Sequence, residues 1–371
     1  MNLAIFSPSQ NPYSETFIQA HKSFIRAERL YYIFGGGFQN MQIENDGPII
    51  SHRQQLWLKG KARLTRQNFK VALEHKIALR LKELKVDVAL IEYGTHAMKL
   101  IPVLKQANIP FVVHFHGYDA SIKIVLEKHH NYKQLFAEAY GVIAVSKVMY
   151  KRLLDLGCPK EKLVYNVYGA NPLFKKRQPQ FSKKQAVAIG RFVDKKAPYY
   201  TIMAFKHVVK KYPSAQLKMA GQGVLMNTCS NLIKYLGLQS NIQLLGIVTP
   251  EEVAKLMQES YCFVQHSITA DDGDQEGTPL AVLESALSGL PVVSTYHAGI
   301  PDVIEHEKTG LLCEEHDVDA MANNLIKIFD DVEFAKKLGQ AAREEHLMSF
   351  SLERHIESLN DTLKKAMQGK I

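Results

Sequence analysis

The chain has 371 residues, of which 46% are hydrophobic and 22% charged, a balance that suits a folded protein with enough apolar material for two domains. No apolar run approaches the length of a membrane-spanning helix, and the opening residues MNLAIFSPSQ are typical of a first strand and not of a signal peptide. Four cysteines far apart in the sequence indicate a reducing, cytoplasmic compartment and argue against a disulfide framework or a zinc site.

The net charge of +9 is concentrated in the first half, because residues 1–175 carry 24 Lys and Arg against 13 Asp and Glu. Between Ser51 and Lys85, ten basic residues stand against two acidic ones, and this stretch also holds the single tryptophan, Trp57. Basic residues with an interfacial aromatic predict a peripheral contact with an anionic membrane surface, at the inner face of the cell membrane. A solvated helix face is the alternative. Nucleic acid is not expected, because no nucleic-acid-binding motif accompanies the charge.

In the first half, short apolar and partly β-branched runs alternate with helical patterns, one of which covers residues 68–84. This alternation predicts a parallel sheet covered by helices on both faces. The strands are expected at residues 3–6, 30–34, 86–91, 110–114, 141–145 and 162–167.

The same pattern starts again after residues 171–182, NPLFKKRQPQFS, which form the predicted joint. Two α/β series predict two doubly wound, Rossmann-like domains over residues 1–172 and 173–350. A C-terminal helix within 351–371 is expected to pack back toward the first domain. Ligands of such sheets bind at the carboxyl ends of the strands, so we expect the site in a cleft between two facing sheets. Strands are expected at 185–189, 216–220, 242–244, 261–266, 291–294 and 310–312, and helices at 198–212, 250–260, 279–288, 317–330 and 351–367.

The loop GRFVDKKAP follows the predicted strand 185–189 and leads into a helix. Arg191, Lys195 and Lys196 stand at the carboxyl end of a strand and before a proline, Pro198, at the first helical position, an arrangement that suits an anion. Charged loop residues are also common as solvated surface, so this loop does not decide the function by itself.

The stretch ADDGDQEGTPLAVLESALSGLP places Glu276 and Glu284 on either side of a helix start. Thr278 is a suitable N-cap, Pro279 a suitable first helical residue, and Gly289 a suitable stop. Such a helix start, with its free N–H groups and its dipole, predicts a second place for an anion. A calcium or magnesium loop is the alternative, but the spacing departs from the EF-hand pattern and no metal is expected. Its acidic residues would be Asp271, Asp272, Asp274 and Glu276.

Two histidines follow the predicted strand 110–114 in the sequence HFHGYD. His116 is the functional candidate, because Gly117 beside it lets a ligand approach closely, whereas His114 is interpreted as structural. After the strand 216–220, Gly221 and Gly223 fit either a tight turn with some proximity to a phosphate or the start of a dinucleotide fingerprint, although Met226 stands at the last glycine position of that fingerprint.

The order HFHGYD, GRFVDKKAP and EGTPLAVLE resembles the retaining glycosyltransferases of family 4, the glycosyl transferases group 1, which have the GT-B fold. The pair of glutamates with seven residues between them and the GR…KK loop are specific together and not alone. Further similar stretches, YGVIAVS, LGLQSNIQLLGIVTPEEV and SGLPVVSTYHAGIPDVI, extend the resemblance over nearly the whole chain. The start NPYSETFI and the KKAP and ADDGDQEGTP variants are most similar to the branch that builds exopolysaccharide, capsule and lipopolysaccharide.

The resemblance implies a role for each motif. Arg191 and Lys196 would hold the diphosphate of the donor, Glu276 would contact the donor sugar, and Glu284 the ribose. His116 would lie near the transferred sugar, so the catalytic candidates are His116, Glu276, Arg191 and Lys196. The rest of the donor site would be Gly221, Gly223, Gly277, Thr278, Pro279 and Leu280.

The acceptor side is less well marked. Asp119 would lie beside the acceptor or orient its own loop. Family members usually carry a glycine pair in the first loop, which this chain lacks. Ser14, Glu15 and Thr16 are therefore acceptor-side candidates by position only.

Together these features predict a retaining transferase that moves a sugar from a UDP- or GDP-sugar to a saccharide or lipid-linked saccharide in bacterial surface polysaccharide synthesis. No metal or other cofactor is expected, because Arg191, Lys196 and a helix N-terminus supply positive charge for the leaving diphosphate. The resemblance implies retention by a front-face route in which the leaving phosphate helps to deprotonate the acceptor. The alternatives are a non-catalytic sugar-nucleotide or glycan-binding protein and a sugar-nucleotide epimerase of the same fold.

Overall fold

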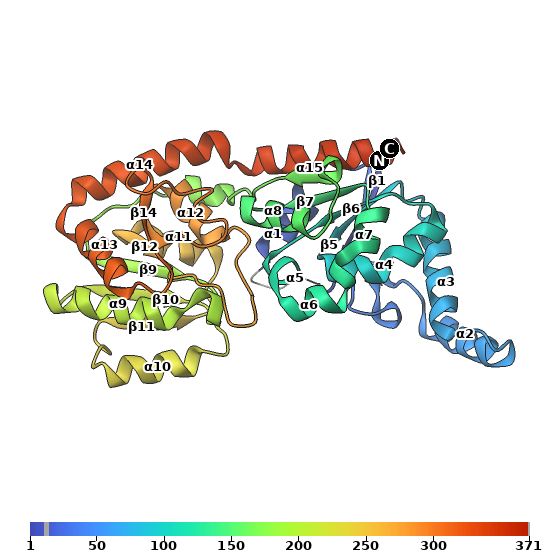
Figure 1. Cartoon of the computed structure of the whole chain (residues 1–371), viewed down its shortest axis with the longest axis horizontal. Helices are drawn as coiled ribbons and strands as arrows, with labels where there is room; N and C mark the ends of the chain where they lie inside the picture. Colours follow the sequence, from blue (N-terminus) through green and yellow to red (C-terminus); the bar gives the residue numbers. More distant parts are fainter. Residues whose placement is uncertain (11–14, 370–371) are drawn as a thin grey trace. The chain divides into compact units, whose positions relative to one another are not determined.

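The computed structural model describes residues 1–10 and 15–369, which divide into two compact units (Figure 1). The first unit comprises Met1–Val145, Met149–Asn166 and the chain from Ile356 onward. The second comprises Ser146–Val148 and Val167–His355.

The first unit is built on a sheet whose described strands have the order β4-β3-β2-β1-β5-β6-β7-β8. Neighbours from β2 to β8 are parallel, whereas β3 pairs antiparallel with both β2 and β4 at one edge. The strands are β1 Asn2–Ser7, β2 Arg29–Phe34, β3 Gln42–Ile43, β4 Gly47–Pro48, β5 Val88–Glu92, β6 Phe111–His114, β7 Gly141–Ala144 and β8 Leu163–Tyr165. The helices are α1 Thr16–Phe24, α2 His52–Leu64, α3 Phe69–Glu83, α4 Gly94–Ala107, α5 Gly117–Ser121, α6 Lys123–Lys128, α7 Lys133–Glu138 and α8 Lys147–Asp155.

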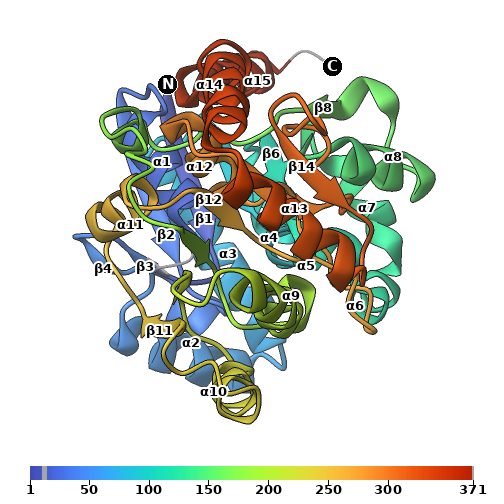
Figure 2. The same ribbon diagram turned by 90° about the vertical axis from the view of Figure 1, so that its left-hand side faces the viewer.

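The second unit has a parallel sheet in the order β11-β10-β9-β12-β13-β14. Helices α9 and α13 lie side by side on it (Figure 2). The strands are β9 Gln185–Ile189, β10 Gln216–Ala220, β11 Ile242–Gly246, β12 Cys262–Val264, β13 Val292–Thr295 and β14 Gly310–Cys313. The helices are α9 Pro198–Lys211, α10 Met226–Tyr235, α11 Pro250–Gln258, α12 Leu280–Ser288, α13 Val318–Asp330 and α14 Val332–Ser349. Helix α15 Leu352–Met367 begins at the end of the second unit, and from Ile356 onward it belongs to the first.

Strands β5, β6 and β7 of the first sheet and β12 and β13 of the second are buried along their whole length, as expected of parallel strands covered on both faces. Strand β5, for example, is VALIE, and every one of its residues is buried, including Glu92. The predicted pair of doubly wound, Rossmann-like sheets is confirmed. None of the described helices combines the length and the apolar character needed to cross a bilayer.

The helix ends agree with the sequence at most positions. The Asp317 side chain accepts a hydrogen bond from the backbone N–H of Ala320 and caps α13, and Gly289 ends α12 with a φ of +84°. The prediction of Thr278 as the N-cap of α12 is wrong by one residue. Pro279 has an extended backbone, with a ψ of 122°, and therefore holds the cap position before Leu280.

Candidate functional site

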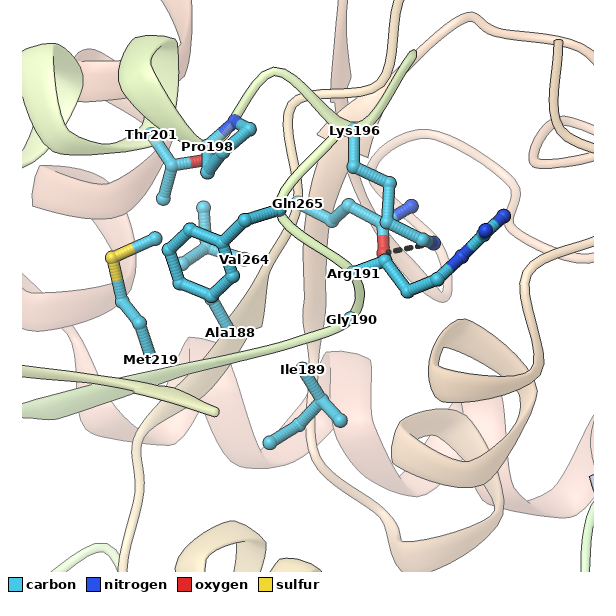
Figure 3. A pocket seen from close by; sticks show the side chains of 11 residues that line it. Ala188, Ile189, Gly190, Arg191, Lys196, Pro198, Thr201, Met219, Val264 and Gln265 are labelled. Atoms are coloured by element: carbon cyan, nitrogen blue, oxygen red, sulfur yellow. Dashed lines mark hydrogen bonds between the residues drawn. The ribbon is translucent and has the colours of Figure 1, made fainter. Parts of the chain in front are cut away.

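The loop after β9 carries two of the predicted phosphate ligands. The Lys196 side chain folds over Gly190, where an added Cβ would lie 2.8 Å from Lys196 Cδ. Lys196 Nζ donates a hydrogen bond to Gln265 Oε1 at 3.3 Å, and Arg191 lies exposed beside them (Figure 3). Two flexible cations at the carboxyl end of β9 form a suitable place for a phosphate group.

Glu276 lies close to these cations. Its Oε1 is 3.2 Å from Lys196 Nζ, and the two side chains are only 10% and 15% exposed. Burial would raise the pKa of Glu276, but Lys196, Lys195 and His297 outweigh that effect and lower the pKa to about 2. Glu276 is therefore a buried, ionised acceptor, suited to hydroxyl donors.

Lys195 has a different role from the one expected. It is buried, and its Nζ lies 2.9 Å from Asp274 Oδ1 and donates to the backbone oxygen of Gln275 at 3.2 Å. Lys195 therefore fixes the loop that carries Glu276 and does not join Arg191 as a free cation. Asp274 and Glu276, two members of the alternative metal loop, are each engaged by a lysine.

Glu284 lies half-buried inside α12, and its carboxylate has neither a hydrogen bond nor an ion pair within residues 1–10 and 15–369. Burial raises the pKa of Glu284 to about 8. An unpartnered, partly desolvated carboxyl group gains strongly from a hydrogen-bonding ligand. The two glutamates that look alike in the sequence thus differ sharply in their surroundings.

The backbone around Glu284 and Glu276 is tightly packed. The N–H of Gly299 donates to the carbonyl oxygen of Gly277 at 3.0 Å, while Thr278 is buried and precedes the α12 cap. Gly221 and Gly223 also lie close to other backbone: a Cβ on Gly221 would collide with the carbonyl oxygen of Gly190, and one on Gly223 with that of Phe192. Of the two interpretations of these glycines, the tight turn is the one that this close approach of backbone fits.

In the first unit, His116 is held by a buried carboxylate that the sequence did not single out. Glu92 is fully buried; its Oε2 lies 3.1 Å from His116 Nε2 and its Oε1 2.7 Å from His21 Nδ1. Burial would raise the pKa of Glu92, but His21 and His116 outweigh that effect and hold it well below its ordinary range. The ring of His114 stacks on that of His116 at 4.9 Å, consistent with a structural part for His114.

Glu92, His114 and His116 also form a candidate metal centre, because their donor atoms lie within 4.8 Å of one another. Glu92 would be the third ligand beside the two histidines. Both oxygens of Glu92 already pair with imidazoles, so a hydrogen-bond network is the simpler explanation of this cluster.

Asp119 is completely buried and orients its own loop. Its carboxylate accepts from the backbone N–H groups of Gly94 and of His116, the latter at 2.8 Å. Burial raises the pKa of Asp119 to about 6, although His116 and these bonds lower it.

The other predicted acceptor-side residues are at the start of α1. Glu15 Oε1 accepts a 2.7 Å hydrogen bond from the Tyr93 hydroxyl, Thr16 is exposed, and Ser14 lies outside the described residues. Within residues 1–10 and 15–369, no side-chain hydrogen bond or ion pair distinguishes Thr16 from other exposed residues.

Sequence reasoning also missed His297, whose Nε2 accepts from the backbone N–H of Glu276 at 3.1 Å, and Glu315, whose Oε1 lies 2.6 Å from His297 Nδ1. One signal was present: Glu92 and His297 stand at or just beyond the carboxyl ends of predicted strands, where ligand sites of such sheets collect. Burial and pairing, which separate them from ordinary strand-end residues, are properties of the folded chain.

Comparison with known proteins identifies a family for the second half of the chain. Residues 171–345 match the family described as Glycosyl transferases group 1. The chain is 30% identical over 269 residues to the amylovoran biosynthesis glycosyltransferase AmsK of Erwinia amylovora, covering 71% of this chain and 66% of that protein. It is 30% identical over 215 residues to the putative colanic acid biosynthesis glycosyltransferase WcaL of Escherichia coli, covering 57% and 53%. The matches thus span between about half and just under two thirds of these relatives.

Solved structures share the fold over the whole length. A glycosyltransferase from Rickettsia africae has a TM-score of 0.76 at 18% identity, covering 100% of this chain and 99% of its own. HepE from Anabaena, solved with UDP and glucose, has a TM-score of 0.75 at 17% identity, covering 98% and 99%. The fold is GT-B, as predicted.

Proposed function

We propose that this chain, whose residues 171–345 form a glycosyl transferases group 1 domain, transfers a sugar from a nucleotide-diphosphate donor to a hydroxyl of a saccharide. The observation that carries the proposal is the arrangement of Arg191, Lys196 and Glu276, cations for a diphosphate beside a buried carboxylate for sugar hydroxyls. Glu284, ionisable and without a partner among the described residues, is proposed to bind the ribose diol.

The proposed chemistry needs positive charge where the sugar–phosphate bond breaks. Negative charge grows on the leaving diphosphate, and preorganised cations aimed at it stabilise the transition state. Arg191 and Lys196 supply that charge, so we propose a metal-independent reaction with retention of configuration by a front-face route. His116, positioned by Glu92 and Asp119, is proposed to take part in transfer.

The relatives suggest the pathway, because AmsK and WcaL are described as amylovoran and colanic acid biosynthesis glycosyltransferases. We therefore place this chain in exopolysaccharide synthesis, with a UDP- or GDP-sugar as donor and a lipid-linked saccharide as acceptor. HepE, the structural neighbour, was solved with UDP and with UDP-glucose, which favours testing UDP-sugars first.

Helix α2 supports a membrane-proximal acceptor. Trp57 is 63% and Leu64 88% exposed, and Lys61 Nζ lies 5.1 Å from the Trp57 ring centroid. We call α2 with its exposed cations Arg53, Lys59, Lys61 and Arg63 the basic helix. Exposed apolar side chains among cations fit the interface of an anionic lipid layer, and we propose that the basic helix contacts the inner face of the cell membrane.

The test is a panel of UDP-, GDP- and ADP-sugars, in which thermal unfolding reports binding and released nucleotide reports slow hydrolysis without acceptor. A transferase is expected to be stabilised by at least one sugar nucleotide and to release nucleotide and free sugar from it. Binding without any release would favour the non-catalytic binding protein. Conversion to an epimeric sugar nucleotide would favour the epimerase, and the absence of binding would remove the proposal.

A further inference from the structure

His297 and Glu315 lie behind Glu276 and connect it to the sheet. His297 follows β13 and Glu315 follows β14, and the His297 ring is fully buried. Nδ1 of His297 is 2.6 Å from Glu315 Oε1, and Nε2 is 3.1 Å from the backbone nitrogen of Glu276. The second carboxylate oxygen of Glu315, Oε2, accepts from the backbone N–H of Thr269 at 2.8 Å.

These contacts fix where the proton of His297 is. A backbone N–H can only donate, so Nε2 must carry the lone pair that accepts from Glu276. Nδ1 must then carry the proton that is donated to the Glu315 carboxylate. The ring is therefore the neutral Nδ1–H tautomer, with its orientation set by the carboxylate behind it.

We propose that His297, oriented by Glu315, is a positioning residue for Glu276: it anchors the backbone of Glu276 so that the carboxylate is held toward the donor sugar. This inference rests on the proposed function for the role of Glu276, but not for the hydrogen bond itself. The carboxylate of Glu276 reaches Lys196 on one side while its backbone N–H is held by His297 on the other. Misplacing a contacting group by about 1 Å can cost on the order of a hundredfold in rate, which is why such anchors matter.

Three substitutions separate the effect of losing the hydrogen bond to Glu276 from the effect of losing side-chain volume. His297→Ala removes the acceptor. His297→Gln offers an amide oxygen that accepts from Glu276 and does not take up a proton at any working pH. Glu315→Gln keeps the shape of the side chain, but the Thr269 N–H holds its amide oxygen at the Oε2 position, so that the NH₂ group faces Nδ1 of His297. Nδ1 must then accept, and the ring proton moves to Nε2. There it faces the N–H of Glu276, and the hydrogen bond is lost. His306→Ala is the matched control, because His306 Nδ1 also accepts from a backbone N–H, that of Leu312, at 2.9 Å.

Two readouts are needed. The first requires no ligand: hydrogen–deuterium exchange of the backbone amide of Glu276 should become about tenfold or more faster in His297→Ala and Glu315→Gln, and stay near the wild-type rate in His297→Gln and His306→Ala. The second is hydrolysis of whichever UDP- or GDP-sugar the wild type turns over. There kcat should fall about tenfold in His297→Ala and Glu315→Gln while KM changes less than threefold, and His297→Gln should restore kcat.

The two readouts also separate this inference from the proposed function. Faster exchange with no hydrolysis of any sugar nucleotide by the wild type would leave the anchor standing and remove the proposed function. Unchanged exchange, or wild-type kcat in both His297→Ala and Glu315→Gln, would overturn the anchor. If His297→Ala fails to fold, Glu315→Gln against His297→Gln gives the same comparison.

Discussion

Glu276 and Glu284 lie eight residues apart, yet their charges face opposite surroundings. Glu276 has Lys196 at 3.2 Å and a pKa lowered to about 2, so it is ionised at every physiological pH. Glu284 has only its burial, which raises its pKa to about 8, so it is largely protonated at neutral pH. One is a fixed anion and the other a group that a ligand can ionise.

Replacement of Glu276 by glutamine keeps the shape of the side chain and removes the fixed anion. We expect turnover of the donor to fall on the order of a hundredfold or more, since a positioned transition-state contact is lost. Steady-state release of nucleotide from the donor found in the sugar-nucleotide panel measures the effect. Glu251→Gln, an exposed change in the first turn of α11, is the control. Activity within a few-fold of wild type would contradict the role of Glu276.

Glu284 predicts a pH-dependent stability with a definite sign. Its folded pKa of about 8 exceeds its ordinary value, so between pH 4.5 and 8 the folded state binds a proton that the unfolded state has released. Stability therefore falls as the pH rises through this window. Glu284→Gln should lose that slope, and its advantage over the wild type should grow by on the order of 3–4 kcal/mol between pH 5 and pH 8.5. Urea unfolding at both values measures it, and an equal difference at the two pH values would refute the prediction.

At the scale of single residues, the sequence predicted which residues form the donor site, but it did not predict which side chains they contact. Arg191, Lys196, Glu276 and Glu284 stand in recognisable motifs, and the structure brings the first three together. Lys195 was grouped with the cations, because the sequence does not show that Asp274 lies within 2.9 Å of it. Glu92 and His297 stand in apolar, strand-like contexts, and their importance depends on contacts far along the chain.

At the scale of elements, the basic helix is the feature without an intramolecular explanation. Its N-terminus has a full capping box between Ser51 and Gln54, and Leu58 and Ala62 face inward, so the helix is stable without the exposed Trp57 and Leu64. These two exposed side chains lie among cations and do not pack against other described residues, as expected of a surface that contacts a membrane or another partner.

Removal of the charge of the basic helix should weaken its contact with lipid. We expect a variant with glutamine at five basic positions to bind anionic vesicles at least tenfold more weakly in low salt, with the difference shrinking as salt rises. The positions are Arg53, Lys59, Lys61 and Arg63 of the basic helix and Arg66, which follows its C-terminus. Vesicle sedimentation measures binding.

The control for this variant has the same change in charge at five exposed lysines of the second unit. These are Lys206, Lys210, Lys234, Lys255 and Lys337. Equal weakening in the control would mean that net charge alone drives binding. Unchanged binding in the basic-helix variant would show that α2 does not contact lipid and is an ordinary solvated helix face.

At the scale of the whole molecule, the alternation of strands and helices predicted both sheets and the fold class, because buried parallel strands are apolar runs that leave a clear signal. The short antiparallel edge of β3 and β4 left none, since two-residue strands have no periodicity. Helix α14 was not predicted either. It contains Gly339, which reads as a break, yet a Cβ at that position would collide with the carbonyl oxygen of Gly289. Close packing between distant segments, which no local pattern records, required that glycine.

The ion pair between Lys196 and Glu276 bears on how a reaction cycle would end. A sugar nucleotide that draws Lys196 toward its phosphates also brings hydroxyl groups to Glu276, so both buried charges keep partners. The spent nucleotide brings phosphates alone, and Glu276 would then be left as a buried carboxylate without a donor, a costly state. Departure of that nucleotide lets Lys196 return to Glu276. The pair would thus oppose inhibition by product and help to empty the site for the next donor.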